Sequence, residues 1–444
     1  MAIIQKQYLF SWKNFHNDVQ TLGDLERFKL VIETMPDKKL MKTLRLLRGN
    51  GRNDYPIEAM WNSILAGIIY EHVSIESLRR DLSRNAQLRE MCGFNPILGV
   101  KSVPGKSAYN RFLSNLFKHE FLIREMFDCL VKELTVLFPG FGKNLAGDGK
   151  AIHSLGKPSK KNKDKRREKD ADWGVKSYKG INKDGKLWKK VKSWFGFRLH
   201  LIADADAELP VTYEVTKASV GEKPIMNELF AKLNKVHPEI IDRSENAMLD
   251  KGYDSKEIIC NLWNKYSIKP IIDIRNMWKD GEKTKQLITK KIQNITYDYK
   301  GTVFCHYPKT GVIRQMAYGG FEKEREALKY ICPKLAYGIE CKGALQCSLH
   351  QKSLRISRKE DLRIFTPVAR SSYKWKTLYN KRTSIERVNS RLDVSFGFER
   401  HYIRGLMKMK LRCGLALSVM LAISVGRLRQ KHPELMRSLV KVVA

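Results

Sequence analysis

Three carboxylates in this chain of 444 residues have the settings that metal-dependent phosphate chemistry requires. Asp148 closes the apolar run NLAGD and precedes a glycine, and Asp250 closes AMLD before KGYDS. In an open α/β sheet, strand ends bring side chains from separate segments together at one edge. Each aspartate taken alone is equally well explained as an ordinary turn residue. Together they predict two acids at one sheet edge.

Glu386 is the third carboxylate, and it lies inside the strongly basic segment LYNKRTSIERVNSRLD (378–393). If this segment is one helix, Tyr379, Arg382 and Glu386 share a stripe at i, i+3 and i+7. A neighbouring apolar stripe would dock the helix beside the two aspartates. The alternative is a surface ion pair between Arg382 and Glu386, worth only a few tenths of a kcal/mol. The basic residues placed to contact phosphates are Lys381, Arg382, Arg387 and Arg391.

Three carboxylates in basic surroundings suit phosphodiester chemistry. Mg²⁺ prefers oxygen ligands, usually a few carboxylates with waters and a substrate phosphate. Two such ions about 3.5–4 Å apart can activate the attacking oxygen and stabilise the leaving one. With the metals bound, the site becomes cationic where negative charge develops. The expected site is therefore two Mg²⁺ or Mn²⁺ ions held by Asp148, Asp250 and Glu386.

The overall charge indicates the partner. The chain has 83 Lys and Arg against 47 Asp and Glu, a net charge of +36. Such an excess predicts attraction to polyanions, and basic side chains that cover phosphates release counterions, so nucleic acid is the expected partner. With 43% hydrophobic residues the chain can bury a full core in two or three units. Eight cysteines are too few for a disulfide-framed secreted protein.

Periodicity divides the chain into a helical first part and a mixed α/β remainder. Short helices separated by tight breaks suit a DNA-reading unit that presents Lys106 and Arg111; a plain helical bundle is the alternative. Short strands from about residue 144, then alternating helices and strands, predict a mixed sheet covered by helices. The expected parts are a helical DNA-binding domain (1–140), a first part of the catalytic core (141–275), a β-containing insertion (276–368), C-terminal core helices (369–430) and a tail (431–444).

A charged segment interrupts the sheet. Residues 157–192 hold 15 basic and 5 acidic side chains with few aliphatic ones. This composition predicts a mobile loop that tracks DNA, with a solvated linker as the alternative. The residues expected to contact DNA there are Lys160, Lys161, Arg166 and Arg167.

No segment predicts secretion or membrane insertion. The start MAIIQKQYLFSWKNFHND lacks an apolar core followed by a cleavage site, which favours a cytoplasmic, nucleoid-associated protein. The run GLALSVMLAISVG (414–426) has 13 residues, fewer than the ~20 needed to cross a bilayer, and predicts a buried helix.

Several of these segments occur in the order seen in DDE transposases of bacterial insertion sequences. NLAGDGKAIHS, MLDKGYDS and LYNKRTSIERVNSRLD carry the resemblance, and Tyr379, Arg382 and Glu386 match the family's Tyr-x2-Arg-x3-Glu motif. The resemblance implies an RNase H-like catalytic domain, two Mg²⁺ ions on the three acids, and DNA contacts from Tyr379 and Arg382. It further implies cleavage at the terminal inverted repeats, transfer of the 3′-hydroxyl ends into target DNA, and a homodimer on double-stranded DNA.

One position departs from the family pattern. The family often continues Glu-x6-Lys, and here that position is Asp393. Either Arg391 or Lys381 takes over the phosphate contact, or binding of the element ends is weakened. Two other functions therefore stay open: an inactive or domesticated DNA-binding relative, and a metal-dependent nuclease without strand transfer.

Four cysteines lie within the insertion, at Cys305, Cys332, Cys341 and Cys347. Four thiolates could hold a structural zinc ion. Their spacings of 26, 8 and 5 intervening residues lack paired CxxC motifs, and four reduced, partly buried thiols are the alternative. His306 and His350 are candidate substitute ligands.

Overall fold

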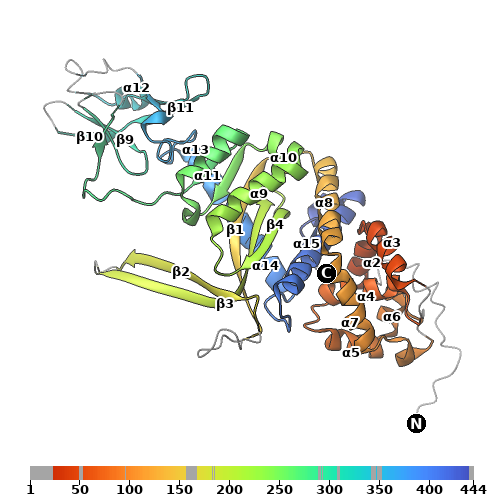
Figure 1. The fold of residues 1–444 in the computed structure, drawn as a ribbon. Helices are drawn as coiled ribbons and strands as arrows, with labels where there is room; N and C mark the ends of the chain where they lie inside the picture. Colours follow the sequence, from red (N-terminus) through yellow and green to blue (C-terminus); the bar gives the residue numbers. More distant parts are fainter. Residues whose placement is uncertain are drawn as a thin grey trace, which may run out of the picture.

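The computed structural model describes residues 24–49, 54–95, 97–156, 168–182, 184, 186–288, 292, 294–307, 311–341, 347 and 353–439. The first described part is helical, as predicted (Figure 1). Ser74 caps one of these helices, because its side chain accepts a hydrogen bond of 3.1 Å from the amide of Ser77. The elements are α2 (Asp24–Thr34), α3 (Lys38–Arg48), α4 (Ile57–Ile69), α5 (Ile75–Arg84), α6 (Ala86–Cys92), η3 (Gly99–Ser102), α7 (Lys106–Lys118) and α8 (Glu120–Leu137).

The catalytic sheet follows directly. Its central path runs β4-β3-β1-β5-β6, with β1, β3 and β4 antiparallel and β1, β5 and β6 parallel. Helices connect the later strands, so the predicted mixed α/β fold is confirmed. The elements are β1 (Asn144–His153), β2 (Asp172–Ile181), β3 (Leu187–Asp204), β4 (Leu209–Lys217), α9 (Glu222–Val236), α10 (Pro238–Arg243), β5 (Asn246–Leu249), η5 (Lys251–Tyr253), α11 (Lys256–Cys260), the π-helical turn η6 (Asn261–Lys265) and β6 (Lys269–Ile272).

Tight packing holds the first strand of the site in place. A Cβ atom at Gly147 of β1 would lie 2.6 Å from Leu249 Cδ2 and 2.9 Å from Met226 Cε. A larger residue there would require the ends of the Leu249 and Met226 side chains to move. The glycine next to Asp148 therefore lets helix and sheet approach closely at the base of the candidate site.

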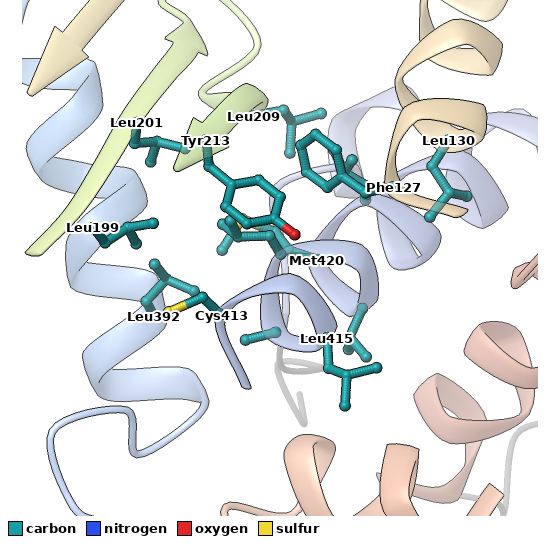
Figure 2. Close-up of a cluster of buried hydrophobic side chains, with 14 of the residues drawn as sticks. Phe127, Leu130, Leu199, Leu201, Leu209, Tyr213, Leu392, Cys413, Leu415 and Met420 are labelled. Carbon is teal, nitrogen blue, oxygen red and sulfur yellow. The ribbon is translucent and has the colours of Figure 1, made fainter. Parts of the chain in front are cut away.

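Three C-terminal helices pack onto this sheet: α13 (Tyr373–Asn380), α14 (Thr383–Ser395) and α15 (Leu406–Arg429). Figure 2 shows Leu392 of α14 and Cys413 of α15 beside Leu199 of β3, in one buried cluster. Phe127 of α8 meets the ring of Tyr213 of β4 edge-on, with centroids 4.9 Å apart. One core thus joins the N-terminal helices, the sheet and the helix that carries Glu386.

Helix α15 is the predicted buried helix, although it is longer than expected. Among the described residues it is the one helix long and apolar enough to cross a membrane, and 94% of its apolar window is buried in the protein. Contacts with α8, α2, α4 and β4 account for this burial. A 3₁₀ turn, η9 (Pro433–Leu435), follows it.

The expected continuous helix around Glu386 is wrong in one respect. It is broken at Lys381 and Arg382, between α13 and α14. Backbone hydrogen bonds there span three residues instead of four, for example from Ser384 N to Lys381 O and from Ile385 N to Arg382 O. This tighter turn redirects the chain, so Tyr379 and Glu386 lie on successive helices rather than on one stripe.

The prediction of a mobile loop over 157–192 is also wrong for much of that segment. β2 and the first half of β3 pair from Asp172↔Gly196 to Ile181↔Leu187 and form a long two-stranded ribbon (Figure 1). Alternating apolar residues such as Trp173 and Val175 favour a β-strand. The prediction of a loop used the charge of the segment and did not consider this alternation. Lys160, Lys161, Arg166 and Arg167 lie outside the described residues.

The insertion before the glutamate helix has its own core, with members from Ile274 to Ala369. It contains two antiparallel sheets, in the strand orders β10-β9-β8-β7 and β11-β12-β13. Its elements are β7 (Lys285–Gln286), β8 (Ile295–Tyr297), β9 (Val303–His306), β10 (Ile313–Gln315), β11 (Ala317–Glu322), β12 (Ala327–Ile331), α12 (Pro333–Tyr337), β13 (Ser353–Ser357) and η8 (Arg358–Glu360).

Candidate catalytic site

The two aspartates lie side by side. In the parallel pair of β1 and β5, Gly147 is opposite Leu249, which makes Asp148 and Asp250 the next neighbours in register. Asp250 follows the end of β5, where its Oδ1 accepts a 2.7 Å hydrogen bond from the amide of Gly252. The two acids are neighbours at the end of the parallel pairing, as predicted, but the prediction that Asp148 ends a strand is wrong, because β1 continues to His153 in its pairing with β3.

Asp148 is held in an environment that disfavours its charge. Burial raises the pKa of its carboxyl to about 6, and the neighbouring charges of Asp250 and Glu222 act in the same direction. Lys176 and the amide of Gly149 oppose the rise. Ionising Asp148 beside two other acids costs free energy. A divalent cation bound there would lower that cost.

Lys176 and Glu222 belong to this site, although the sequence did not reveal them. Lys176 Nζ lies 3.2 Å from Glu222 Oε1 and donates a 3.2 Å hydrogen bond to the carbonyl of Gly149. Arg198 NH1 lies 3.4 Å from the same Glu222 oxygen. In the sequence, Glu222 is marked only by its position in the first turn of a helix after Gly221. An acid at this position is common and does not by itself indicate a functional site.

Asp273 is a third acid at this edge. Leu249 of β5 is opposite Ile272 of β6, so Asp273 follows β6 as Asp250 follows β5. Lys251 Nζ lies 3.7 Å from Asp273 Oδ2. In the sequence, Asp273 ends the short apolar run of KPIIDI, and a single turn acid of this kind gives no reason to select it.

Glu386 lies in the first turn of α14, on a helix that packs against β1 and β3. Its Oε1 accepts a 2.7 Å hydrogen bond from Arg382, and 56% of its side chain is exposed. Burial lowers the pKa of Arg382, but the hydrogen bond and charge of Glu386 raise it. The charges of Tyr379 and Asp148 add to this rise, and the pKa is raised overall. Arg382 therefore lies between the third acid and the first.

An aromatic platform adjoins this arginine. The rings of Trp375 and Tyr379 stack with centroids 4.6 Å apart and planes 12° apart. The guanidinium of Arg382 lies 5.9 Å from the Tyr379 ring. Tyr379 and Arg382 therefore form one surface next to Glu386, as the motif implied.

The other basic residues of this segment are paired within the protein. Lys381 Nζ lies 2.6 Å from Asp206 Oδ1, and Arg387 Nε lies 2.6 Å from Glu208 Oε1. Arg391 also contacts Glu208, and its side chain is only 15% exposed. These acids lie between β3 and β4, so the three cations anchor α14 to that turn in this structure.

Asp393 has a partner that sequence reasoning did not foresee. Its Oδ2 lies 2.5 Å from Nζ of Lys150, two residues beyond Asp148 on β1. The Lys150 side chain is 11% exposed and that of Asp393 is 25% exposed. The acid at the unusual position is thus paired with a lysine of the sheet, while Arg391 and Lys381 pair with Glu208 and Asp206.

We expect Asp393→Lys to lower the free energy of unfolding by about 2–4 kcal/mol, because it places two ammonium groups together in a partly buried position. Urea denaturation monitored by circular dichroism measures this. The double variant Lys150→Asp/Asp393→Lys restores the opposite charges and should recover most of the loss. A single variant as stable as the parent would show that the pair does not matter.

The two residues predicted to read DNA from the N-terminal part, Lys106 and Arg111, are both exposed on α7. Tyr109 between them is fully buried, and its hydroxyl lies 2.8 Å from Ser63 Oγ. One face of α7 therefore packs in the core and the other presents the two cations. They lie on a different element from the acids.

The three acids offer oxygen ligands of the kind that a divalent cation prefers, although Glu386 is paired with Arg382. Asp148 and Asp250 offer adjacent carboxylates, and Glu386 would have to exchange Arg382 for the metal. Within the described ranges, no three His, Cys, Asp or Glu side chains are close enough to hold a metal ion.

The four cysteines of the insertion lie around Cys305. The amide nitrogen Nδ2 of Asn294 is 3.9 Å from Cys305 Sγ and 3.8 Å from Cys347 Sγ. Burial raises the pKa of Cys305 to about 12, and Cys347, Cys332 and Cys341 are near enough to add to that rise. His306 bonds to Thr296 instead, at 2.7 Å, and His350 lies outside the described residues.

Comparison with known proteins identifies the family. The family described as "Transposase DDE domain" matches residues 165–421, more than half of the chain. The chain belongs to the DDE transposase family. It is thus a DNA transposase, and its family normally uses divalent metal ions. The matched range includes Asp250 and Glu386 and begins after Asp148, whose assignment depends on its register beside Asp250.

No curated protein matches this transposase. A solved structure of piggyBac transposase in a synaptic complex with hairpin DNA is 13% identical to it, covers 95% of this chain and 86% of that chain, and has a TM-score of 0.29. A similarity of this size carries no argument about the fold or the site.

Proposed function

We propose that this transposase binds the ends of an insertion sequence, hydrolyses phosphodiester bonds there, and transfers the 3′-hydroxyl ends into target DNA. The observation that supports it most is the register of β1 and β5, which places Asp148 beside Asp250. The helix that carries Glu386 packs against the same strand, β1. These are the acids that the family motif implies for catalysis.

In this proposal Asp148, Asp250 and Glu386 hold two Mg²⁺ or Mn²⁺ ions. When bound, the ions activate the attacking oxygen and stabilise the leaving oxygen. The chain's own residues prepare that chemistry. Lys176 offsets the negative charge around Asp148 before the metals arrive, and the Arg382 guanidinium, once released by Glu386, is free to bind a DNA phosphate beside the ring of Tyr379.

A gel assay separates this function from its two alternatives. Purified protein is incubated with Mg²⁺ and labelled DNA that carries the gene's own flanking ends, together with a second, unlabelled DNA. Labelled strands joined to the second DNA support the transposase. Cut strands without joining support a nuclease, and retarded but intact DNA supports a DNA-binding relative.

We also propose that the protein works as a homodimer on double-stranded DNA, because joining two element ends to one target requires two catalytic sites. Light scattering of the complex with end DNA measures its mass. One chain per complex carrying two ends would contradict this.

We further propose that Cys305, Cys332, Cys341 and Cys347 hold a structural zinc ion. A buried thiol with three thiols nearby is costly to ionise, and Zn²⁺ would bind it as the thiolate. The thiols would have to move closer than they lie in this structure.

We expect about one zinc per chain by plasma emission on protein washed free of loose metal, and a loss of most of it in Cys305→Ser. Cys129, which is exposed on α8, provides the matched control, since Cys129→Ser should retain the metal. Less than half an equivalent in the parent protein would contradict the zinc site.

A further inference from the structure

The ribbon formed by β2 and the first half of β3 is the most isolated element of the catalytic domain. It extends away from the sheet (Figure 1), and among the described elements its first strand, β2, has substantial contacts only with β3 and a few with β4. Residues Leu187–Ser193 of β3 are all exposed, whereas the rest of the strand is buried. A lone two-stranded ribbon is only marginally stable in water, so an exposed one of this length calls for a ligand.

The ribbon is fixed at its base. The backbone amide of Gly405, which precedes α15, donates 3.0 Å hydrogen bonds to both carboxylate oxygens of Glu168, and the amide of Leu406 donates one of 3.2 Å to Asp170. A Cβ atom at Gly196 would lie 2.1 Å from the carbonyl oxygen of Ile152, so only glycine allows the strands to approach where the ribbon leaves the sheet. The direction of the ribbon is therefore set by the core.

Strand register separates the ribbon into two unlike faces. Lys176 is directly opposite Lys192, and alternation places Lys190 and Trp188 on that same face. The other face carries the apolar side chains of Trp173, Val175, Leu187 and Val191, which are 45–83% exposed, with Lys189 among them. We call the first of these the basic face.

The basic face leads into the catalytic site. Lys176, which begins it, contacts Glu222 and the carbonyl next to Asp148 at 3.2 Å each. The charges of Lys190 and Lys192 then continue outward from the acids along one line.

We propose that the duplex whose scissile phosphate lies at Asp148 and Asp250 continues along the basic face of the ribbon, which contacts its backbone through Lys190 and Lys192. The inference rests on the proposed function, since it assumes that DNA is bound at these acids. From Lys192 to Trp188 the strand rises about 13 Å, which spans about four base pairs. The ribbon thereby fixes the path of the DNA beside the cleavage point.

Two neighbouring lysines provide a matched test. Lys190→Glu and Lys189→Glu make the same charge reversal at neighbouring residues of one exposed strand. The two residues lie on opposite faces of the ribbon. Affinity for end DNA is measured by fluorescence anisotropy over a range of salt concentrations. We expect Lys190→Glu to weaken binding and to reduce the slope of log K against log salt by about one, whereas Lys189→Glu leaves the slope unchanged.

The length of the DNA gives a second readout. On a duplex truncated at the mapped cleavage position on the ribbon side, the difference between the two variants should disappear. Equal effects of both variants, or none from either, would overturn the inference. If the parent protein still cuts and joins DNA in that case, only the ribbon path is wrong and the proposed function stands; if the parent does neither, the proposed function has failed as well.

Discussion

Asp148→Asn is expected to stabilise the metal-free protein at neutral pH while it abolishes DNA cleavage. The carboxyl of Asp148 has its pKa raised from 3.8 to about 6 by burial and by nearby acids. An acid whose pKa is raised in the folded state destabilises the fold as pH rises from its unfolded to its folded value. Each pKa unit corresponds to about 1.4 kcal/mol, so the gain from the neutral amide is about 1–3 kcal/mol above pH 6.

Urea denaturation in the presence of a chelator, between pH 4 and pH 8, measures this gain. The advantage of Asp148→Asn should be small near pH 4, grow up to about pH 6 and then stay constant. Added Mg²⁺ should stabilise the parent protein and not the variant, because only the parent keeps the ligand. A variant less stable than its parent at pH 7 would show that Asp148 serves the fold rather than a metal site.

Glu386→Gln is expected to lower the rate of cleavage and joining by about a thousandfold or more, equivalent to roughly 4 kcal/mol of transition-state stabilisation. DNA affinity should be unchanged or slightly higher. The amide retains an oxygen for the hydrogen bond from Arg382, while one negative charge and one metal ligand are lost. Anisotropy and the gel assay measure the two properties separately.

The matched control for this variant is Glu399→Gln. Glu399 is 73% exposed and lies near the same helix, but 4.0 Å from Lys150 rather than next to Arg382. Glu399→Gln should leave DNA affinity and the rate of cleavage and joining close to those of the parent protein. Loss of DNA binding in Glu386→Gln alone would mean that this glutamate is structural.

The parts of the site that follow from local pattern were predictable from the sequence. Asp148 and Asp250 each end an apolar run, and both come directly after the residues of β1 and β5 that pair in parallel, although only Asp250 follows a strand end. The helix of Glu386 has buried Ile385, Val388 and Leu392 at helical spacing, which predicts how it packs. Strand order was less certain, since it depends on contacts between distant segments.

What could not be predicted depends on tertiary contacts. Lys176 reaches Glu222 only because the ribbon leaves the sheet beside α9, and no local pattern links residues 46 positions apart. Asp393 and Lys150 are farther apart in the sequence, and their pairing exists only once α14 lies on β1. Charge density indicated a loop at 157–192 because it outweighed the alternating apolar residues of the ribbon.

The central claim is that Asp148, Asp250 and Glu386 form one metal site. The most direct test counts bound Mn²⁺ by electron paramagnetic resonance, using protein in complex with end DNA that cannot be cleaved. We predict about two ions per chain for the parent and fewer for both Asp148→Asn and Glu386→Gln. Equal Mn²⁺ binding by all three proteins would contradict a shared site and leave Glu386 as the surface partner of Arg382.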